Sequence, residues 1–353
     1  MVTPFPETPN LPPRKLLTMN GQPSPNPTKT GGFLHRMKSL LKSPAARLRK
    51  MIHESVRFEI QEQVIPRLDH LVNLGQDQRC RFAIPLGNNE LLMACPSGFI
   101  LVPADDISVV TCFVNGGDME PGTRMLVSRI LESGNTFVDV GANLGIMTLA
   151  AARAVGPKGK VIAFEPFEQT KRLLERTVWA NGLGQMVTIH HAAVSDHEGT
   201  HEFHVGPTCG HNSLFPLASS GIPTPGVKET GTTVTVNLVR LDQVLSETAP
   251  VHLLKIDAEG AELEVLESAA KIIRSQPEIS LIVEFGPGHL KRRGLTTGDW
   301  LGRFQDLGLE YRAVHPFTSG LEITTPEKLE QVHSENLFFA RPKSKIWQKL
   351  VGV

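Results

Sequence analysis

Short apolar runs alternate with helical patterns from residue 135 onward. The runs that predict strands are Thr136–Val140, Val161–Phe164, Val187–His190, Leu253–Ile256, Ile279–Phe285 and, near the end, Asn336–Ala340. The segments between or after them that predict helices are Ile146–Val155, Gln169–Asn181, Gly260–Ala270 and Thr297–Leu307. Strands of continuous apolar character joined by helical crossovers predict a parallel sheet covered on both faces, which is an α/β fold.

Two stretches depart from this alternation. Residues Leu91–Val114 are β-like, with Pro103 and an acidic pair as breakers, and Gly117–Leu131 predicts a helix that leads into the first strand of the sheet. The segment His197–Val239 is long and rich in Gly, Thr, Ser and Pro. We expect it to be an insertion or lid on the substrate side, because long excursions in compact domains are usually functional.

The N-terminal part has a different composition. Residues 1–30 are rich in proline and poor in apolar residues, which predicts a disordered tail. Residues 31–79 carry helix-spaced apolar positions and a basic run over 36–50 without an acid, so they predict an amphipathic helical extension. Such a basic face contacts anionic membrane surfaces, packs on a second subunit of a homo-oligomer, or is simply solvated.

These shifts divide the chain of 353 residues into a tail (1–30), an extension (31–79), a β-rich and helical lead-in (80–134), a cofactor-binding domain (135–341) and a C-terminal tail (342–353). Acids and bases are equal in number, so there is no global charge that favours nucleic acid. Four dispersed cysteines predict a reducing compartment without structural zinc. No apolar run is long enough to span a membrane or to form a secretory signal, which predicts a cytoplasmic protein with at most a peripheral membrane contact.

The most informative chemistry lies in a glycine turn after the first strand of the sheet. Asp139 precedes Gly141, Asn143 and Gly145, and Glu165 ends the next strand. Glycines let the backbone approach a ligand closely, and the helix behind them presents free N–H groups. An acid at the tip of the second strand can hold both hydroxyls of a ribose. The pattern predicts a site for a nucleoside-bearing cofactor, whereas the alternative is only a tight strand-to-helix turn.

The spacing of the glycines favours one cofactor over another. A dinucleotide site needs G-x-G-x-x-G, and Asn143 stands where its middle glycine would be. The carboxylate of Asp139 would repel a pyrophosphate but attract a cation. S-adenosylmethionine has a sulfonium and an ammonium group and no phosphate. We therefore predict S-adenosylmethionine, with a nicotinamide-dependent oxidoreductase as the alternative.

Further polar residues follow the later strands. Asp257 and Glu259 come after Leu253–Ile256, and Glu284 ends an apolar strand, so all three are expected at the ligand-binding edge of the sheet. A structural reading makes Asp257 a helix N-cap and Glu259 a first-turn acid. No third ligand is evident near this pair, so no metal is predicted. His211 and His289 are candidate bases, although a loop histidine is more often a surface residue.

Several of these motifs occur together in a known order. They are the segments 139–145 (DVGANLG), 164–166 (FEP), 192–196 (AAVSD), 212–214 (NSL), 254–262 (LKIDAEGAE) and 283–285 (VEF). Over residues 90–341 the chain resembles the FkbM family of S-adenosylmethionine-dependent methyltransferases, with Ala258 where that family often has valine. The resemblance implies a Rossmann-like class I fold, with a seven-stranded sheet that is parallel except for a reversed last strand. It also implies O-methylation of a hydroxyl on a sugar, glycan, glycolipid or natural product.

Within this resemblance each site residue has an expected role. Asp139 and Gly141 would face the methionine part of the donor, Glu165 the ribose, and Ala193 the adenine. Asn143 and Gly145 would also bind the donor. His211, Asn212 and Glu284 would contact the acceptor. Asp257 and Glu259 would be catalytic, because a hydroxyl acceptor must be oriented and lose its proton. The non-enzymatic alternative is a methyltransferase-fold protein that has lost activity and serves as a binding module.

Overall fold

The computed structural model describes residues 82–206, 208–216, 232–245 and 249–352. All of them lie in the second of two compact units, Pro66–Val353. The predictions for the tail 1–30 and for the extension 31–79 fall outside the described residues.

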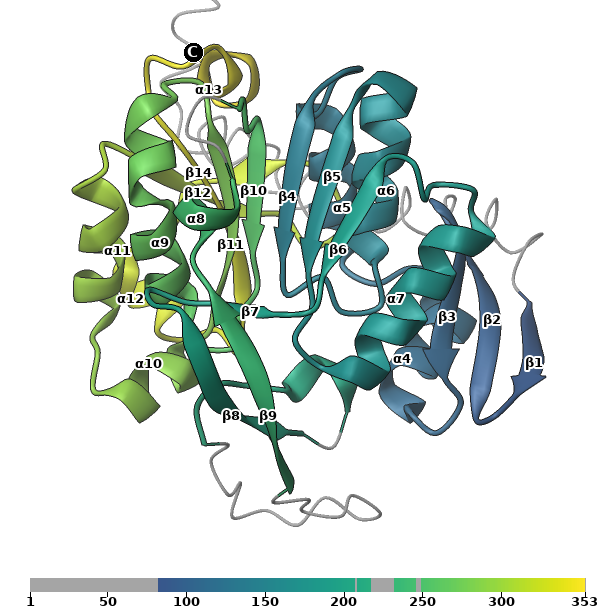
Figure 1. The fold of residues 1–353 in the computed structure, drawn as a ribbon. Coiled ribbons are helices and arrows are strands. Elements are labelled where there is room, and N and C mark those ends of the chain that lie inside the picture. The colour runs from purple at the N-terminus through teal and green to yellow at the C-terminus, as the bar shows by residue number, and fades with distance from the viewer. Residues whose placement is uncertain (1–81, 207, 217–231, 246–248, 353) are drawn as a thin grey trace, which may run out of the picture. The chain divides into compact units, whose positions relative to one another are not determined.

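A central sheet of eight strands forms the core of this unit (Figure 1). Its order is β13-β12-β14-β11-β10-β4-β5-β6. Five neighbouring strands are parallel: β11 (Ser280–Phe285), β10 (Leu253–Ile256), β4 (Thr136–Val140), β5 (Lys160–Phe164) and β6 (Val187–His190). The remaining strands are β14 (Glu335–Ala340), antiparallel to β11, then β12 (Glu310–Val314) and β13 (Leu321–Glu322). The predicted sheet of seven mostly parallel strands is confirmed, and β13 adds a two-residue strand at one edge.

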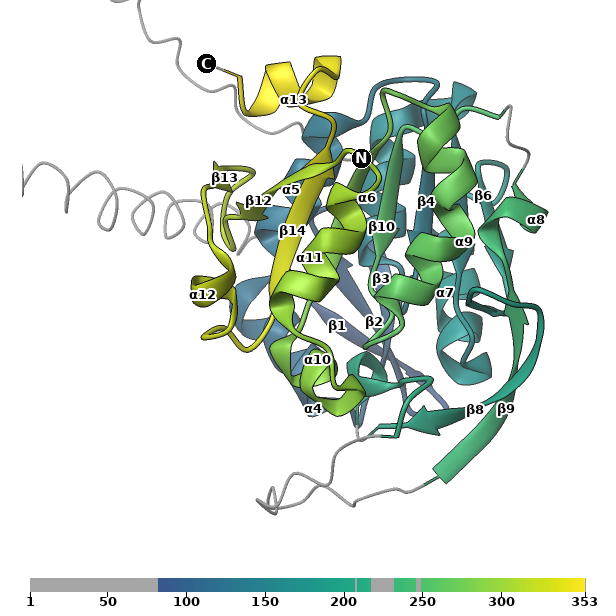
Figure 2. The ribbon, with the colours of Figure 1, turned by 90° about the vertical axis from the view of Figure 1, so that its left-hand side faces the viewer.

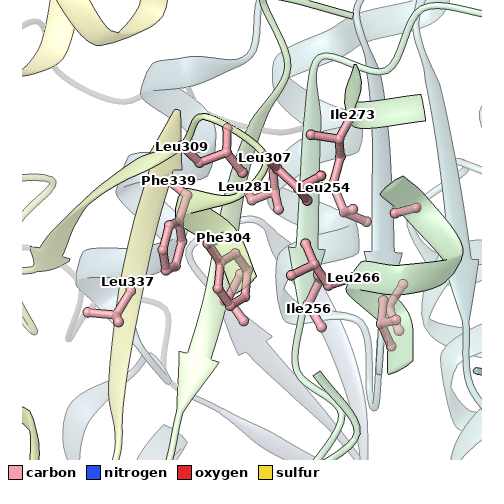
Figure 3. Close-up of a cluster of buried hydrophobic side chains, with 14 of the residues drawn as sticks. Leu254, Ile256, Leu266, Ile273, Leu281, Phe304, Leu307, Leu309, Leu337 and Phe339 are labelled. Atoms are coloured by element: carbon pink, nitrogen blue, oxygen red, sulfur yellow. The ribbon is translucent and has the colours of Figure 1, made fainter. Parts of the chain in front are cut away.

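Helices cover both faces of this sheet (Figure 2). On one face lie α9 (Glu262–Ser275) and α11 (Thr297–Gln305), whose apolar side chains pack on alternate residues of β10, β11 and β14 (Figure 3). On the other face lie α5 (Pro121–Ile130) and α6 (Ile146–Val155), which pack on the intervening residues. This period-two division is expected of strands buried on both sides.

Further helices complete the fold. They are η4 (Gly156–Lys158), α7 (Glu168–Ala180), α8 (Leu241–Val244), α10 (Pro287–Arg293), α12 (Pro326–Leu329) and α13 (Lys345–Leu350). The last helix, α13, buries Trp347 and begins at Ser344, whose Oγ accepts a hydrogen bond from Trp347 N at 3.2 Å.

The lead-in differs from the expected β-like stretch. An antiparallel sheet is formed by β1 (Ala83–Gly87), β2 (Glu90–Cys95) and β3 (Gly98–Pro103), but the chain then turns into α4 (Ile107–Thr111) and the π-helical turn η3 (Cys112–Gly116). Asp106 caps α4, because its Oδ1 accepts from Val109 N at 3.2 Å. The β prediction was therefore wrong for residues 107–114, where the acidic pair is a helix start and not only a breaker.

The excursion after β6 builds a small sheet of its own. Its order is β7 (Ala193–Val194), β9 (Thr232–Val239), β8 (Gly199–Val205), and the turn η5 (Cys209–His211) follows β8 along the chain. Figure 1 shows β8 and β9 extending beyond the carboxyl ends of the parallel strands. The predicted insertion thus borders the ligand-binding edge of the sheet, while residues 217–231 within it lie outside the described part.

Candidate functional site

A cavity of about 270 Å³ opens at the carboxyl ends of β4, β5, β10 and β11. The predicted site residues that line it are Asp139, Gly141, Asn143, Glu165, Ala193, Asn212, Asp257, Glu259 and Glu284. Gly145 is not among the lining residues, and the side chain of His211 lies outside the described part of the structure. Parallel strands that end at one edge bring these residues together, although more than a hundred positions separate the first from the last.

The turn after β4 requires glycine at two positions. Gly141 has a φ of 76°, and a Cβ there would lie 1.8 Å from the carbonyl oxygen of Asp257. Gly145 has a φ of 97°, and a Cβ there would lie 2.5 Å from Leu174 Cδ1. Gly141 therefore allows β4 and β10 to end close together, and Gly145 allows α7 to pack against the start of α6.

Asp139 is fully buried beneath this turn. Thr148 Oγ1 of α6 donates to Asp139 Oδ2 at 2.6 Å, whereas Asp139 Oδ1 has no hydrogen-bond partner. Burial raises the pKa of Asp139, and Lys255 opposes that shift. A buried acceptor oxygen without a partner is costly, so this atom is set to receive a donor from a ligand in the cavity.

Glu165 holds the glycine turn in place. Its Oε2 accepts from Asn143 N and its Oε1 from Phe167 N, both at 2.9 Å. Burial raises the pKa of Glu165 to about 7, although these two backbone donors act against the shift. Each carboxylate oxygen has a second lone pair, so both remain able to accept from a diol.

The segment that follows β6 contributes the side of the cavity predicted for adenine. Ala193 is buried in β7 and lines the cavity with Ala192 and Val194. The preceding residue, His191, is half exposed and is not a lining residue, and its Nε2 lies 3.0 Å from Pro166 O. The side of the cavity predicted for adenine is therefore apolar and begins at Ala192.

Asp257 does not cap a helix. The helix α9 begins at Glu262 with Ala261 as its N-cap, and no side chain caps it. Instead, Asp257 Oδ2 accepts from Lys255 Nζ at 2.6 Å. Burial favours the neutral acid, but the charge and hydrogen bond of Lys255, with Glu284 and His289, together outweigh it and lower the pKa of Asp257. The N-cap interpretation is wrong, and Lys255 is a cavity residue that we did not predict.

Two further carboxylates lie beside Asp257. Glu259 precedes α9, so it is not the first-turn acid of the structural reading, and it has a φ of 50°. His289 Nε2 of α10 lies 3.1 Å from Glu259 Oε2. Burial lowers the pKa of His289, but Glu259 outweighs it and raises the pKa. Nothing in the sequence indicated that His289 would pair with Glu259.

Glu284 donates a hydrogen bond to Asp257, while Glu284 Oε2 has no partner. Burial and the neighbouring acids Asp257 and Glu259 raise the pKa of Glu284 well above its usual range. Glu284 is thus the proton-bearing member of the pair.

The three acids after β10 and β11 come within 4.8 Å of one another. We had found no third ligand near Asp257 and Glu259, and that was wrong, because Glu284 supplies one from the neighbouring strand. Two of the three are already paired with protein cations, Lys255 and His289. We therefore do not assign them as metal ligands, and the absence of a metal stays a prediction.

Asn212 shapes the loop that closes the cavity on the side of the excursion. Its Oδ1 accepts from Gly206 N at 2.9 Å, and its Nδ2 donates to Cys209 O at 3.4 Å. Asn143 Nδ2 donates to the same carbonyl at 3.3 Å, and Cys209 N donates to Asp106 Oδ2 at 2.9 Å. The loop thus links the glycine turn to α4, a connection that the sequence did not indicate.

Comparison with known proteins identifies the fold that carries this site. The methyltransferase FkbM domain family matches residues 139–311, which contain all the strand-end acids described above. Residues 139–311, just under half of the chain, thus resemble the methyltransferase FkbM domain. The chain is also similar to methyltransferase sdnD of Sordaria araneosa, at 31% identity over 39% of the chain and 61% of that relative. The match therefore spans less than two thirds of the relative's length.

Two solved structures are similar in fold. A methyltransferase FkbM of Methylobacillus flagellatus shares 16% identity over 67% of this chain and 55% of its own, with a TM-score of 0.39. A SAM-dependent O-methyltransferase of Thermotoga maritima shares 15% identity over 71% of this chain and 77% of its own, with a TM-score of 0.35. Within the described residues of the chain, no helix is both long and apolar enough to cross a membrane.

Proposed function

We propose that this protein is a methyltransferase of the FkbM type, which transfers the methyl group of S-adenosylmethionine to a hydroxyl of a sugar, glycan, glycolipid or secondary metabolite. The observation that carries the proposal is the unpartnered, fully buried Oδ1 of Asp139 in a cavity lined by six carboxylates. Such a cavity suits a ligand that brings positive charge.

The residues at the glycine turn fit the donor. Asp139 Oδ1 would accept from its ammonium group, and the carboxylate of Glu165 from its ribose hydroxyls. The donor could approach the backbone at Gly141 closely, because no Cβ fills that space. The same residues suit a dinucleotide poorly. Its pyrophosphate would face the carboxylate of Asp139, and Asn143 stands where a dinucleotide-binding turn has its middle glycine. None of the comparisons favours an oxidoreductase or an inactive binding module.

The acids on the other side of the cavity would handle the acceptor. S-adenosylmethionine supplies a methyl group already activated by the sulfonium, so the protein mainly orients the hydroxyl for in-line attack. Asp257 is kept ionised by Lys255 and would accept a hydrogen bond from that hydroxyl. Glu259 would take the proton, with His289 holding its carboxylate. The free Oε2 of Glu284 would accept from a second hydroxyl.

The proposal is tested with isotopically labelled S-adenosylmethionine and extracts of glycans, lipids and small metabolites. We expect label in a hydroxyl-bearing product as an ether that survives mild base, which hydrolyses methyl esters. Label on nitrogen or carbon would overturn the O-methyl assignment, and no transfer to any fraction would favour a binding module.

The role of Asp257 is tested by Asp257→Asn. Because the change acts on the transition state more than on donor binding, we expect transfer to fall at least about a hundredfold with little change in donor affinity. The exposed Asp299→Asn is the matched control. A folded Asp257→Asn protein with normal turnover would exclude a catalytic role.

A further inference from the structure

Lys255 is a buried lysine inside an apolar strand. It lies on β10 between Leu254 and Ile256 and is 3% exposed. In the register of the parallel strands it is the partner of Asp139 on β4. In-register residues of neighbouring strands point to the same face, so the ammonium and the donor-site carboxylate lie side by side. The Nζ of Lys255 then reaches the strand end and donates to Asp257 Oδ2 at 2.6 Å.

Three carboxylates act on the charge of Lys255: Asp257 after β10, Glu120 before α5 and Asp139 on β4. Two further titratable groups face Asp257, namely Glu284 on β11 and His289 on α10. Among the described lining residues of the cavity, Lys255 is the one lysine or arginine. Burial alone would lower its pKa, but the carboxylates of Asp257, Glu120 and Asp139 outweigh that effect and raise it.

This arrangement has a consequence for donor binding. A cationic donor needs ionised carboxylates, yet crowded and buried carboxylates tend to take up protons. Asp139 shows the conflict, because its burial raises its pKa while Lys255 lowers it. If the lysine charge were absent, Asp139 and Asp257 would each be nearer to the neutral acid at physiological pH.

We propose that Lys255 is a positioning residue of the donor site, which keeps Asp139 and Asp257 ionised and fixes the orientation of Asp257. The inference rests on the proposed function, since it concerns the binding of the cationic donor. The rival explanation is that Lys255 and Asp257 form only a structural ion pair within the sheet. In that case the loss of the lysine charge would lower stability without changing how donor binding responds to pH.

The test measures the calorimetric affinity of Lys255→Met and Lys255→Arg for S-adenosylhomocysteine between pH 7 and pH 9. With Lys255→Met we expect affinity at pH 7 to fall about tenfold or more, the effect of raising one essential carboxylate pKa by about one unit. Affinity should recover as pH rises, because the carboxylates ionise again. Above pH 8 the affinity of the wild type should be nearly constant, since Glu165, with a pKa of about 7, is then ionised.

Two variants make the result specific. Lys255→Arg keeps the charge and should restore most of the affinity and the flat response above pH 8. Lys349→Met removes an exposed lysine paired with Glu132 and should bind as the wild type does. If Lys255→Met does not fold, the double variant Lys255→Met with Asp257→Asn removes both members of the pair and should still bind more tightly at pH 9 than at pH 8, through Asp139.

The outcomes separate the two proposals. If Lys255→Met binds S-adenosylhomocysteine as the wild type does, the inference is overturned but the proposed function stands. The same holds if its affinity falls by an equal factor at pH 7 and pH 9. If the double variant is needed, equal binding at pH 8 and pH 9 would overturn it too. No binding of S-adenosylhomocysteine by the wild type would overturn the proposed function, and the inference with it.

Discussion

Glu165 makes donor affinity depend on pH in a way that one substitution should remove. Its two carboxylate oxygens each accept a backbone N–H at 2.9 Å, from Asn143 and from Phe167. In Glu165→Gln one of these N–H groups would face an amide NH₂ instead of an acceptor. The neutral amide would also replace the charged acceptor proposed for the ribose hydroxyls. The loss of a hydrogen bond to a charged group costs about 1.5–3 kcal/mol, so we expect donor affinity to fall by a factor of about 10–150.

The sign of the pH effect follows from the raised pKa. With a pKa of about 7, Glu165 is largely protonated below that pH in the donor-free protein. Ribose hydroxyls that donate to the carboxylate favour its ionised form, so the donor must displace the proton. The dissociation constant of the wild type should therefore rise as pH falls below 7, approaching about tenfold per pH unit. Glu165→Gln cannot titrate and should lack this slope.

The assay is calorimetric titration with S-adenosylhomocysteine from pH 5.5 to pH 8.5, with melting temperature as a check on folding. The matched control is Glu175→Gln, an exposed glutamate of α7 that pairs with Lys171. The reasoning is refuted if folded Glu165→Gln binds with wild-type affinity, or keeps the wild-type slope below pH 7.

Three further predictions concern the glycine turn, a second buried acid and the N-terminal tail. Gly141→Ala should abolish donor binding and lower the melting temperature, because its Cβ would lie 1.8 Å from Asp257 O; Gly134→Ala, also at positive φ but with open space, should cost only backbone strain. Burial raises the pKa of Glu262 from its ordinary 4.5 to about 7, so its contribution to stability is complete below pH 4.5 and is lost by pH 7. Glu262→Gln should remove up to about 3 kcal/mol of that pH dependence, and an unchanged denaturation profile against pH would contradict this. Deletion of residues 1–30 should leave the melting temperature unchanged, because a proline-rich segment with few apolar residues adds little to a core; a loss of several degrees would count against it.

Much of the sheet and the glycine turn could be predicted because both depend on local pattern. Continuous apolar runs predicted β4, β5, β6 and β10 within a residue of their observed bounds. The turn at Gly141 needs positive φ whatever the rest of the chain does. The pattern failed at residues 107–114, where apolar residues that suit a strand follow an aspartate that caps a helix.

The charge network of the site could not be predicted because it depends on strand order and register. Lys255 meets Asp139 only because β10 pairs with β4, although the two strands are far apart in the sequence. Glu284 meets Asp257 because β11 lies on the other side of β10. The spacing of acids along the chain therefore indicated which residues lie at the edge of the sheet, but not which of them share a proton or a cation.

The central claim is that the cavity above β4 and β5 binds S-adenosylmethionine. The most direct measurement is a calorimetric titration of the full chain with S-adenosylmethionine and, separately, with NAD, repeated on Asp139→Asn. We predict one site of micromolar strength for S-adenosylmethionine, much weaker binding of NAD, and a loss of about tenfold or more in the variant, since a charged hydrogen bond to the donor ammonium is removed. Tight binding of NAD without any response to S-adenosylmethionine would contradict the account.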